Sequence, residues 1–178
     1  MSGIFEGCEN LISIDLSNFN TKDVTDMGKI FWNCKNLTSI SIFNFNTEKV
    51  INMEGMFGFC QSLININLNN FNTQNVTKMS NMFLECKALE YVNLLSFNTQ
   101  NVTNMSNMFS RCVSLLEIDL SNFNTQKVTN MEFIFYLCRS LTDCNLSNFN
   151  TQKGIERRYM FGCCNKLKKK NLIFKYYE

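Results

Sequence analysis

Histidine and proline are both absent from this 178-residue sequence, which also contains only seven glycines and one tryptophan. Without histidine, the side chain that most often acts as a general base near neutral pH and as a metal ligand is missing. No recurring pair of carboxylates takes its place. The sequence therefore predicts no catalytic residue, no cofactor-binding residue, no metal ligand and no cofactor, and we expect a protein that is not an enzyme.

Strong charge and long apolar runs are also lacking. The formal net charge is only +2, so we expect no nucleic-acid partner and no attraction to a charged membrane. No stretch of 18 apolar residues occurs, which argues against membrane insertion. No basic segment followed by an apolar core lies at the start of the chain, so the sequence predicts no signal peptide within these residues.

What the sequence does contain is one unit that returns every 26 residues. The cysteines of this series are Cys8, Cys34, Cys60, Cys86, Cys112, Cys138 and Cys164. Periods of 20 to 50 residues are typical of solenoids, propellers and arrays, and a propeller is disfavoured because each blade would need about four strands. We expect a single solenoid over residues 1–178, with a partial repeat at 1–10, regular repeats over 11–152 and a degraded repeat over 153–178.

Two periodicities within the unit predict its local structure. Residues 115–121 alternate apolar and polar side chains, as a half-buried strand does. Residues 105–112 place apolar side chains at i, i+3, i+4 and i+7, which is one face of a helix, and Thr103 would cap it. These apolar residues are Met105, Met108, Phe109 and Cys112. The sequence thus predicts an α/β fold with one short parallel strand and one short helix per repeat, and about seven strands.

Stacked repeats would bring equivalent residues into files. Asparagines of the Phe-Asn-Thr triplet would form a ladder whose amides bond turn backbone groups; they are Asn20, Asn46, Asn72, Asn98, Asn124 and Asn150. We interpret the cysteine file first as buried free thiols that act as small apolar residues. Two alternatives are disulfides between neighbouring repeats and a zinc site, although the nine cysteines leave at least one unpaired. The zinc ligands would be Cys138, Cys144, Cys163 and Cys164, which lack a C-x2-C pair.

The last repeat departs from the pattern. Gly154 and Arg157 replace the recurring valine and methionine, and Lys170 stands where the last strand should have isoleucine. We interpret residues 168–170, all lysine, as a solvated edge that prevents strand addition. A nucleic-acid or anionic-lipid patch is the weaker alternative, because three lysines are few for such a site.

The repeated pattern Leu-x-x-Ile-x-Leu-x-x-Phe, followed by Val-x-x-Met-x-x-Met-Phe-x-x-Cys-x-x-Leu, resembles that of the BspA-like leucine-rich-repeat surface proteins. The resemblance is clearest in residues 119–125, Asp-Leu-Ser-Asn-Phe-Asn-Thr, and in residues 102–109, Val-Thr-Asn-Met-Ser-Asn-Met-Phe. It implies a right-handed leucine-rich-repeat solenoid that is displayed on the cell surface of a microbe or secreted, and that is often used for adhesion. It implies no catalytic residues.

In such solenoids the strands line a concave face and their outward side chains meet the partner. Phe43 and Tyr91 interrupt a series of small polar residues at these outward positions, and exposed aromatic residues are enriched at recognition sites. We expect a strip that binds a protein or glycan ligand, formed by Phe43, Asn67, Tyr91, Asn93, Glu117 and Asp119. The competing interpretation is that these positions have drifted and contact no partner.

The sequence therefore predicts a non-catalytic binding or adhesion module of a microbial surface protein. We expect a monomer or a part of a longer repeat array. The alternative function is that of an intracellular scaffold or a purely structural repeat segment of a longer protein.

Overall fold

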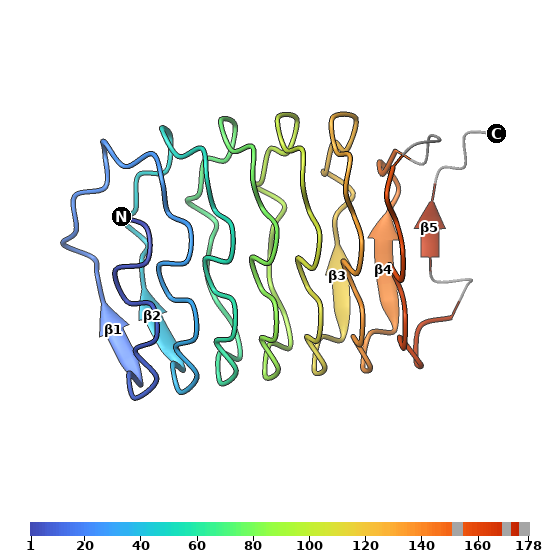
Figure 1. Cartoon of the computed structure of the whole chain (residues 1–178), viewed down its shortest axis with the longest axis horizontal. Helices are drawn as coiled ribbons and strands as arrows, with labels where there is room; N and C mark the ends of the chain where they lie inside the picture. The colour runs from blue at the N-terminus through green and yellow to red at the C-terminus, as the bar shows by residue number, and fades with distance from the viewer. Residues whose placement is uncertain (151–154, 169–171, 175–178) are drawn as a thin grey trace.

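In the computed structural model the chain forms one row of stacked coils, with its two termini at opposite ends of the row (Figure 1). The structure describes residues 1–150, 155–168 and 172–174. We number the coils 1 to 7 by their cysteines, from Cys8 in coil 1 to Cys164 in coil 7. The predicted repeat solenoid is confirmed.

Five short strands lie along one side of the stack, which we call the strand side. They are β1 (Ser13–Asp15), β2 (Ser39–Ser41), β3 (Glu117–Asp119), β4 (Asp143–Leu146) and β5 (Leu172–Phe174). All pairings are parallel, as predicted, but they form two sheets, β1-β2 and β3-β4-β5. Segments 65–67 of coil 3 and 91–93 of coil 4 stand between the sheets and join neither. The described residues thus contain five strands where about seven were expected.

The register of β5 differs from the 26-residue step. Leu172 lies opposite Cys144, whereas a regular step would place Lys170 there. The predicted strand position of Lys170 and most of the lysine run around it lie outside the described residues. Two additional residues therefore precede the last strand.

The opposite side of the stack, which we call the turn side, consists of turns where helices were predicted. No helix occurs in the described residues, and hence none that is long and apolar enough to cross a membrane. In coil 5 Asn107 and Arg111 have φ angles of 55° and 62°, in the left-handed region that a right-handed helix excludes. The same two positions of the other coils also have positive φ: Gly3 and Gly7, Lys29 and Asn33, Gly55 and Phe59, Asn81 and Glu85, Phe133 and Leu137, Tyr159 and Cys163. The helix prediction is wrong.

Backbone N–H groups on the turn side alternate between two kinds of partner. Asn107 donates to the carbonyl of Glu132 in coil 6 at 2.9 Å, while Ser110 donates to the carbonyl of Asn107 within its own coil at 3.1 Å. Three such bonds join coils 1 and 2, and four join the coils at each of the five following steps up to coil 7. We call this unbroken series the turn-side ladder.

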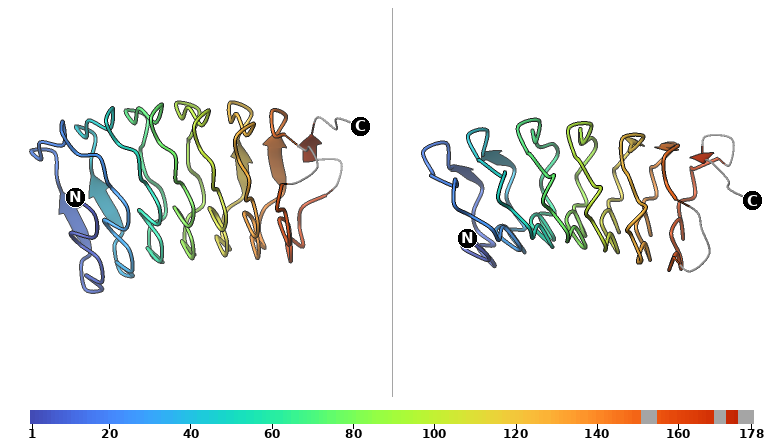
Figure 2. Two further views of the ribbon diagram at one scale, coloured as in Figure 1. Left: turned by 45° about the horizontal axis from the view of Figure 1, so that its top comes forward. Right: turned by 90° about the horizontal axis from the view of Figure 1, so that it is seen from above.

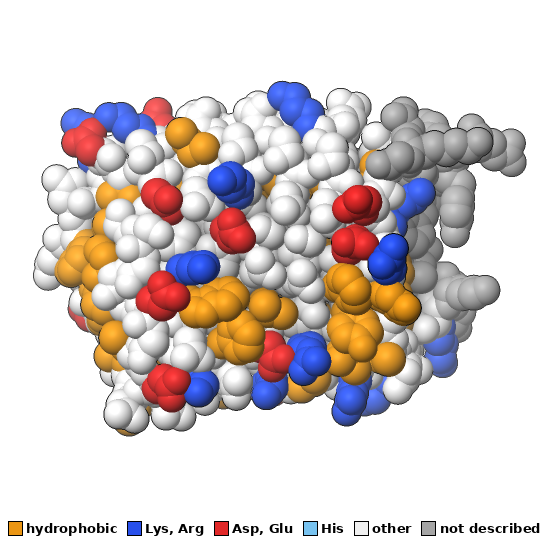
Figure 3. All heavy atoms as spheres, viewed as in Figure 1, with side chains coloured by type: hydrophobic (Ala, Val, Ile, Leu, Met, Phe, Trp, Pro, Cys, Tyr) orange, Lys and Arg blue, Asp and Glu red, His pale blue; other side chains and the backbone are white. Residues whose placement is uncertain are grey.

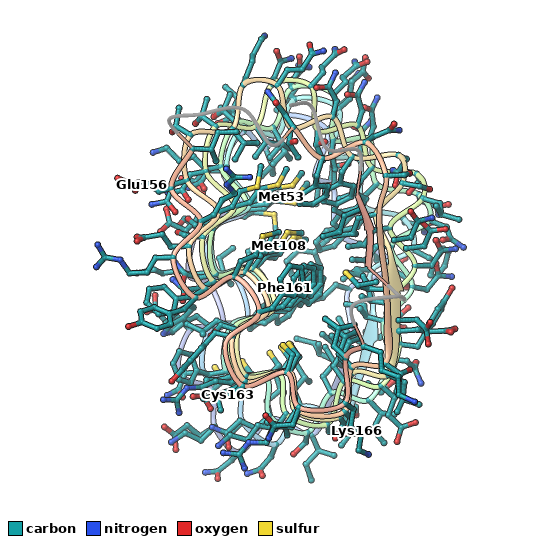
Figure 4. The ribbon with its side chains drawn as sticks, turned by 90° about the vertical axis from the view of Figure 1, so that its right-hand side faces the viewer. Met53, Met108, Glu156, Phe161, Cys163 and Lys166 are labelled. Atoms are coloured by element: carbon teal, nitrogen blue, oxygen red, sulfur yellow. The ribbon has the colours of Figure 1, made fainter. Side chains whose placement is uncertain are left out.

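Coil spacing explains why turns replace helices. The rings of one phenylalanine file, which runs from Phe5 to Phe161, stack at centroid distances of 5.5 to 5.7 Å. Packed helices need 8–10 Å between their axes, so helical segments would not fit at this spacing. The helix-like pattern nevertheless identified the buried residues correctly, because Met105, Met108, Phe109 and Cys112 are all fully buried. Figure 4, a view along the stack, shows Met53, Met108 and Phe161 inside the coils.

Threonines also have a role that differs from the predicted one. Thr103 caps no helix, and its hydroxyl donates to the carbonyl of Thr77 in the preceding coil at 3.3 Å. A second threonine file is buried and bridges coils. Thr73 donates to the carbonyl of Asn98 at 3.0 Å and accepts from the N–H of the same residue at 2.8 Å. The hydroxyl groups of the buried file therefore connect neighbouring coils through side-chain bonds, whereas at Thr103 the backbone N–H also donates to the carbonyl of Thr77, at 3.0 Å.

The asparagine file bonds turn backbone, as predicted, but on the exposed surface. Asn72 accepts from the N–H of Gln74 at 3.1 Å through its side-chain oxygen, and Asn98 does the same with Gln100. Each asparagine thus stabilises its own turn, which is the usual role of an Asx turn.

All nine cysteines are free thiols, so the disulfide alternative does not hold. Cys86 is buried and donates to the carbonyl of Phe57 in the preceding coil at 3.1 Å, and its equivalents in coils 2 to 6 do the same. Burial raises the pKa of the Cys34 thiol to about 11 and that of Cys86 further. The interpretation as buried free thiols is confirmed for these five coils. In the part of the chain that the structure describes, no three cysteine or carboxylate side chains are grouped to hold a metal ion.

The two sides of the stack differ in spacing. In the phenylalanine file of the Phe-Asn-Thr triplet, ring centroids lie 6.4 Å apart between Phe71 and Phe97, and between Phe123 and Phe149. These distances exceed those of the turn-side file. Figure 2 shows the coils converging on the turn side and spreading on the strand side. The strand side is therefore the outer side of the bend, and the expectation of a concave strand face is wrong.

Candidate binding surface

Two adjoining hollows lie on the strand side, where strand pairing is interrupted. The first measures about 490 Å³ and is lined by Tyr91–Leu95 of coil 4, Glu117–Asp119 of β3 and residues 143–145 of β4. The second measures about 450 Å³ and lies between coils 3 and 4. Tyr91 and Asn93 line both hollows, so they form the ridge between them.

The interrupted backbone pairing accounts for the position of the hollows. Only the beginnings of the segments are joined, by a bond of 3.0 Å from Glu90 N–H to the Ile64 carbonyl and one of 3.3 Å from Leu116 N–H to the Glu90 carbonyl. Beyond these bonds, the described segments 65–67 and 91–93 have no ladder between them. Ile66 and Val92 are still buried, so the floor of each hollow is the hydrophobic core.

The structure brings together five of the six residues predicted from the sequence. Tyr91, Asn93, Glu117 and Asp119 line the first hollow, and Asn67 lines the second. Phe43 lines neither hollow, although it is 53% exposed and thus as accessible as Tyr91, at 52%. The predicted strip is therefore centred on coils 3 to 5.

The polar residues of the strip are held by their own turns. The side-chain oxygen of Asn93 accepts from the N–H of Leu95 at 3.0 Å, and a carboxylate oxygen of Asp119 accepts from the N–H of Ser121 at 2.9 Å. Asn67 makes the same bond to Asn69. These bonds orient the side chains and leave the amide nitrogens and the second carboxylate oxygen for a ligand. An aromatic ring beside fixed donors and acceptors is a common composition for recognition surfaces.

Several residues of the hollows were not predicted. Asp143 and Asn145 line the first hollow, and Ile64, Asn65 and Asn69 line the second. Asp143 occupies the same repeat position as Tyr91 and Glu117, so a comparison of outward positions alone would have found it. Which hollow a residue lines depends on the interrupted pairing, for which the sequence carries no evident signal.

The turn side carries two aromatic clusters that sequence reasoning also missed. Trp32 contacts Phe59 with ring centroids 4.9 Å apart, and Phe133 lies 5.4 Å from Tyr159. Two groups of hydrophobic side chains are visible among charged residues on one face in Figure 3. Trp32 lies directly on coil 3, because a Cβ atom at Gly58 would be only 2.4 Å from its ring. The available signal was that most other repeats have small, polar or charged residues at the positions of these aromatic residues.

Stacked coils, parallel strands and files of leucine, phenylalanine and cysteine define a solenoid of the leucine-rich-repeat type. The crystal structure of a leucine-rich repeat protein from T. pallidum is similar, with a TM-score of 0.63 and 19% identity; the match covers 96% of this chain and 71% of that one. This chain belongs to the family described as Mycoplasma protein of unknown function, DUF285, whose model matches residues 1–93 and 61–174. A comparison with curated proteins finds no match.

Proposed function

We propose that this chain is a non-catalytic binding module that recognises a protein or a glycan through the strand side of coils 3 to 5. The observation that carries the proposal is the pair of hollows that meet at Tyr91, where an otherwise regular stack is open. A half-exposed tyrosine between two hollows offers a large apolar contact area. Its side chain has few rotamers, so it loses little conformational freedom on binding. The neighbouring amides and carboxylates supply directional hydrogen bonds.

Display on a microbial cell surface, with a role in adhesion, is part of the same proposal. It is supported by the resemblance of the repeat to BspA-like surface proteins. The alternative, an intracellular scaffold or a structural segment of a longer protein, needs no ligand at Tyr91. Protease treatment of intact cells separates the two, because only a surface-displayed chain would be digested.

Binding is tested by screening the purified chain against a glycan array and immobilised extracellular-matrix proteins. A central aromatic anchor commonly contributes 2 kcal/mol or more, so Tyr91→Ala should weaken binding by roughly 30-fold. Phe43→Ala is the matched control, because it removes an equally exposed aromatic ring outside the hollows. Equal binding by both variants and the unchanged chain would remove Tyr91 from the site.

A further inference from the structure

Charge is distributed unevenly between the strand side and the rest of the chain. The chain as a whole contains 17 basic and 15 acidic residues. On the strand side, coils 1 to 6 contribute six equivalent segments, residues 12–18, 38–44, 64–70, 90–96, 116–122 and 142–148. These segments contain five carboxylates and no lysine or arginine. The strand side therefore attracts cations, although the whole chain has a small positive net charge.

Four of the five carboxylates lie at the two hollows that meet at Tyr91. Glu117, Asp119 and Asp143 line the first hollow, Glu90 lines the second, and all four are exposed. The fifth carboxylate, that of Asp15 in β1, lines neither hollow. None of the described residues that line the hollows is basic. A ligand in the hollows would therefore meet negative charge without a cation of the chain to balance it.

Two of these carboxylates face each other across neighbouring strands. The register of β3 and β4 places Glu117 directly opposite Asp143. Paired strands are about 4.8 Å apart, and like charges directly opposite each other destabilise a sheet. The free chain therefore has an unfavourable contact at the first hollow, which a positively charged ligand group would relieve.

The remaining wall of the first hollow is apolar. Tyr91 and Leu95 of coil 4 line it and are 52% and 54% exposed. A bare metal ion gains nothing from such a wall, and no three carboxylates of the described residues are grouped to hold one. Lysine and arginine side chains, in contrast, combine an aliphatic stem with a charged head. The stem would pack on Tyr91 and Leu95 while the head reaches the carboxylates.

Arginine fits this composition better than lysine does. Its planar guanidinium group stacks on aromatic rings and donates two parallel hydrogen bonds to one carboxylate. One carboxylate oxygen of Asp119 accepts from the N–H of Ser121 at 2.9 Å, and this bond fixes the orientation of the carboxylate. The guanidinium group would thus meet a ring and an acceptor that are already in place, which lowers the entropic cost of binding.

We propose that the ligand is a protein that inserts an arginine side chain into the first hollow, an inference that rests on the proposed function of the strand side. Alternate residues of an extended segment lie about 7 Å apart on one face. Two arginines spaced in this way can occupy the hollows on either side of Tyr91, the second one near Glu90. A neutral glycan would fit less well, because it would remove water from the carboxylates without supplying positive charge.

A pair of peptides tests the charge requirement. The probe is the peptide Gly-Ser-Arg-Ala-Arg-Ala-Arg-Ser-Gly with a zwitterionic rhodamine label, and its binding is followed by fluorescence anisotropy. The control peptide has citrulline, an uncharged side chain of nearly the same shape, in place of each arginine. The arginine peptide should bind saturably and less tightly as salt is added. The citrulline peptide should bind at least about 10-fold more weakly, because it makes no hydrogen bonds from a charged donor.

A matched pair of variants separates the hollow from the general charge of the strand side. Asp119 and Asp15 occupy the same repeat position, and each accepts from the N–H two residues later at 2.9 Å. Asparagine makes the same bond at this position in coils 3, 4 and 6, so Asp119→Asn and Asp15→Asn should both fold normally. We expect Asp119→Asn to weaken binding of the arginine peptide by about 10-fold and Asp15→Asn by less than about twofold, because Asp15 is distant and screened.

The facing carboxylates allow a second measurement that needs no ligand. Glu117→Gln removes the like charge opposite Asp143, so the thermal midpoint of the free chain should rise slightly. The same variant should bind the arginine peptide more weakly. A gain in stability together with a loss of binding is expected of a binding residue, whereas a residue that only stabilises the fold would lose stability.

Three results would overturn the proposal. The first is the absence of saturable binding of the arginine peptide up to roughly 1 mM, and the second is equal affinity for the arginine and citrulline peptides. The third is an equal loss of binding in Asp119→Asn and Asp15→Asn, which would show a diffuse attraction to the acidic side.

Failure of this inference can be distinguished from failure of the proposed function. Tyr91-dependent binding of a neutral glycan, without binding of the arginine peptide, would overturn the inference and leave the proposed function intact. If the proposed function itself is wrong, the chain should bind neither the arginine peptide nor any glycan or matrix protein of the screen.

Discussion

The turn side and the strand side of this solenoid are built from the same 26-residue unit, yet they differ in continuity. The turn-side ladder crosses all six steps, and the phenylalanine rings beside it keep a spacing of 5.5 to 5.7 Å. The strand side pairs only at its two ends and opens between β2 and β3. One side therefore holds the stack together, while the other has room for a ligand.

The comparison also shows where sequence variation is tolerated. Outward positions of the strand side range from serine to tyrosine and glutamate, and the lining of the hollows follows that variation. The turn side varies at its left-handed positions, which carry lysine, asparagine, phenylalanine and glutamate. Residues other than glycine are strained there, so the ladder and the buried files must offset that cost.

The largest expected effect comes from the turn-side phenylalanine file. Phe83→Ala removes a fully buried ring between two stacked neighbours and should lower the free energy of unfolding by about 3–5 kcal/mol. Phe43→Ala, on the strand side, should change it by less than about 0.5 kcal/mol, because that ring is exposed. Urea unfolding followed by circular dichroism measures both. Similar losses for the two variants would contradict the assignment of stability to the turn side.

A smaller effect is expected for the buried threonine file. Thr73→Val leaves the N–H and carbonyl of Asn98 without their hydroxyl partner, which should cost about 1–3 kcal/mol. Thr77→Val is the matched control, since Thr77 is more accessible and its hydroxyl bond is long, at 3.4 Å. If the control destabilises the chain as much as Thr73→Val, the bridging role of the buried file is refuted.

At Asn107, a left-handed turn and a helix predict changes in stability of opposite sign for a substitution by alanine. Asn107→Ala should destabilise the chain by about 1 kcal/mol, because alanine tolerates a φ of 55° poorly. In a helix the same change would be stabilising by up to about 0.7 kcal/mol. Ser106→Ala, one residue earlier and without positive φ, serves as the control. A gain in thermal midpoint for Asn107→Ala would restore the helix prediction.

The smallest expected effect concerns the buried thiols, which should make the folded chain less stable in alkaline solution. Burial raises the pKa of Cys34 from about 9 to about 11, so the folded chain holds its proton where the unfolded chain releases it. The contribution of the protonated Cys34 thiol to stability is fully present below pH 9 and is lost as the pH rises towards 11. Urea midpoints between pH 7 and pH 10.5 should therefore fall above pH 9, and less steeply in Cys34→Ala. Equal slopes in both chains would argue against a role for this thiol.

Much of this architecture could be predicted from residue positions. The strict spacing of Cys34, Cys60 and Cys86 predicts that they stack in one file. All three are fully buried within that file. Alternation around Ile118 predicts β3 and its parallel partner. The spacing of Met105, Met108, Phe109 and Cys112 was interpreted as one face of a helix. A series of tight turns can bury residues at the same spacing, so the pattern identified the buried residues but not the backbone conformation.

The binding surface was less accessible to sequence reasoning. Tyr91 and Asn93 were identifiable because they occupy outward positions of a predicted strand. The hollows beside them exist because backbone pairing stops between β2 and β3. The sequence does not predict this interruption, because similar side chains occupy the paired and the unpaired coils. Phe43 met the same criterion as Tyr91 but lies outside both hollows.

By itself, the sequence determined which side chains are buried and in what order they stack, because a fixed repeat and the hydrophobic effect together specify both. Only the tertiary structure decided the backbone conformation between these buried side chains. Coils about 5.5 Å apart exclude helices, favour a ladder of left-handed turns on one side, and leave the other side wide enough to open at coils 3 and 4.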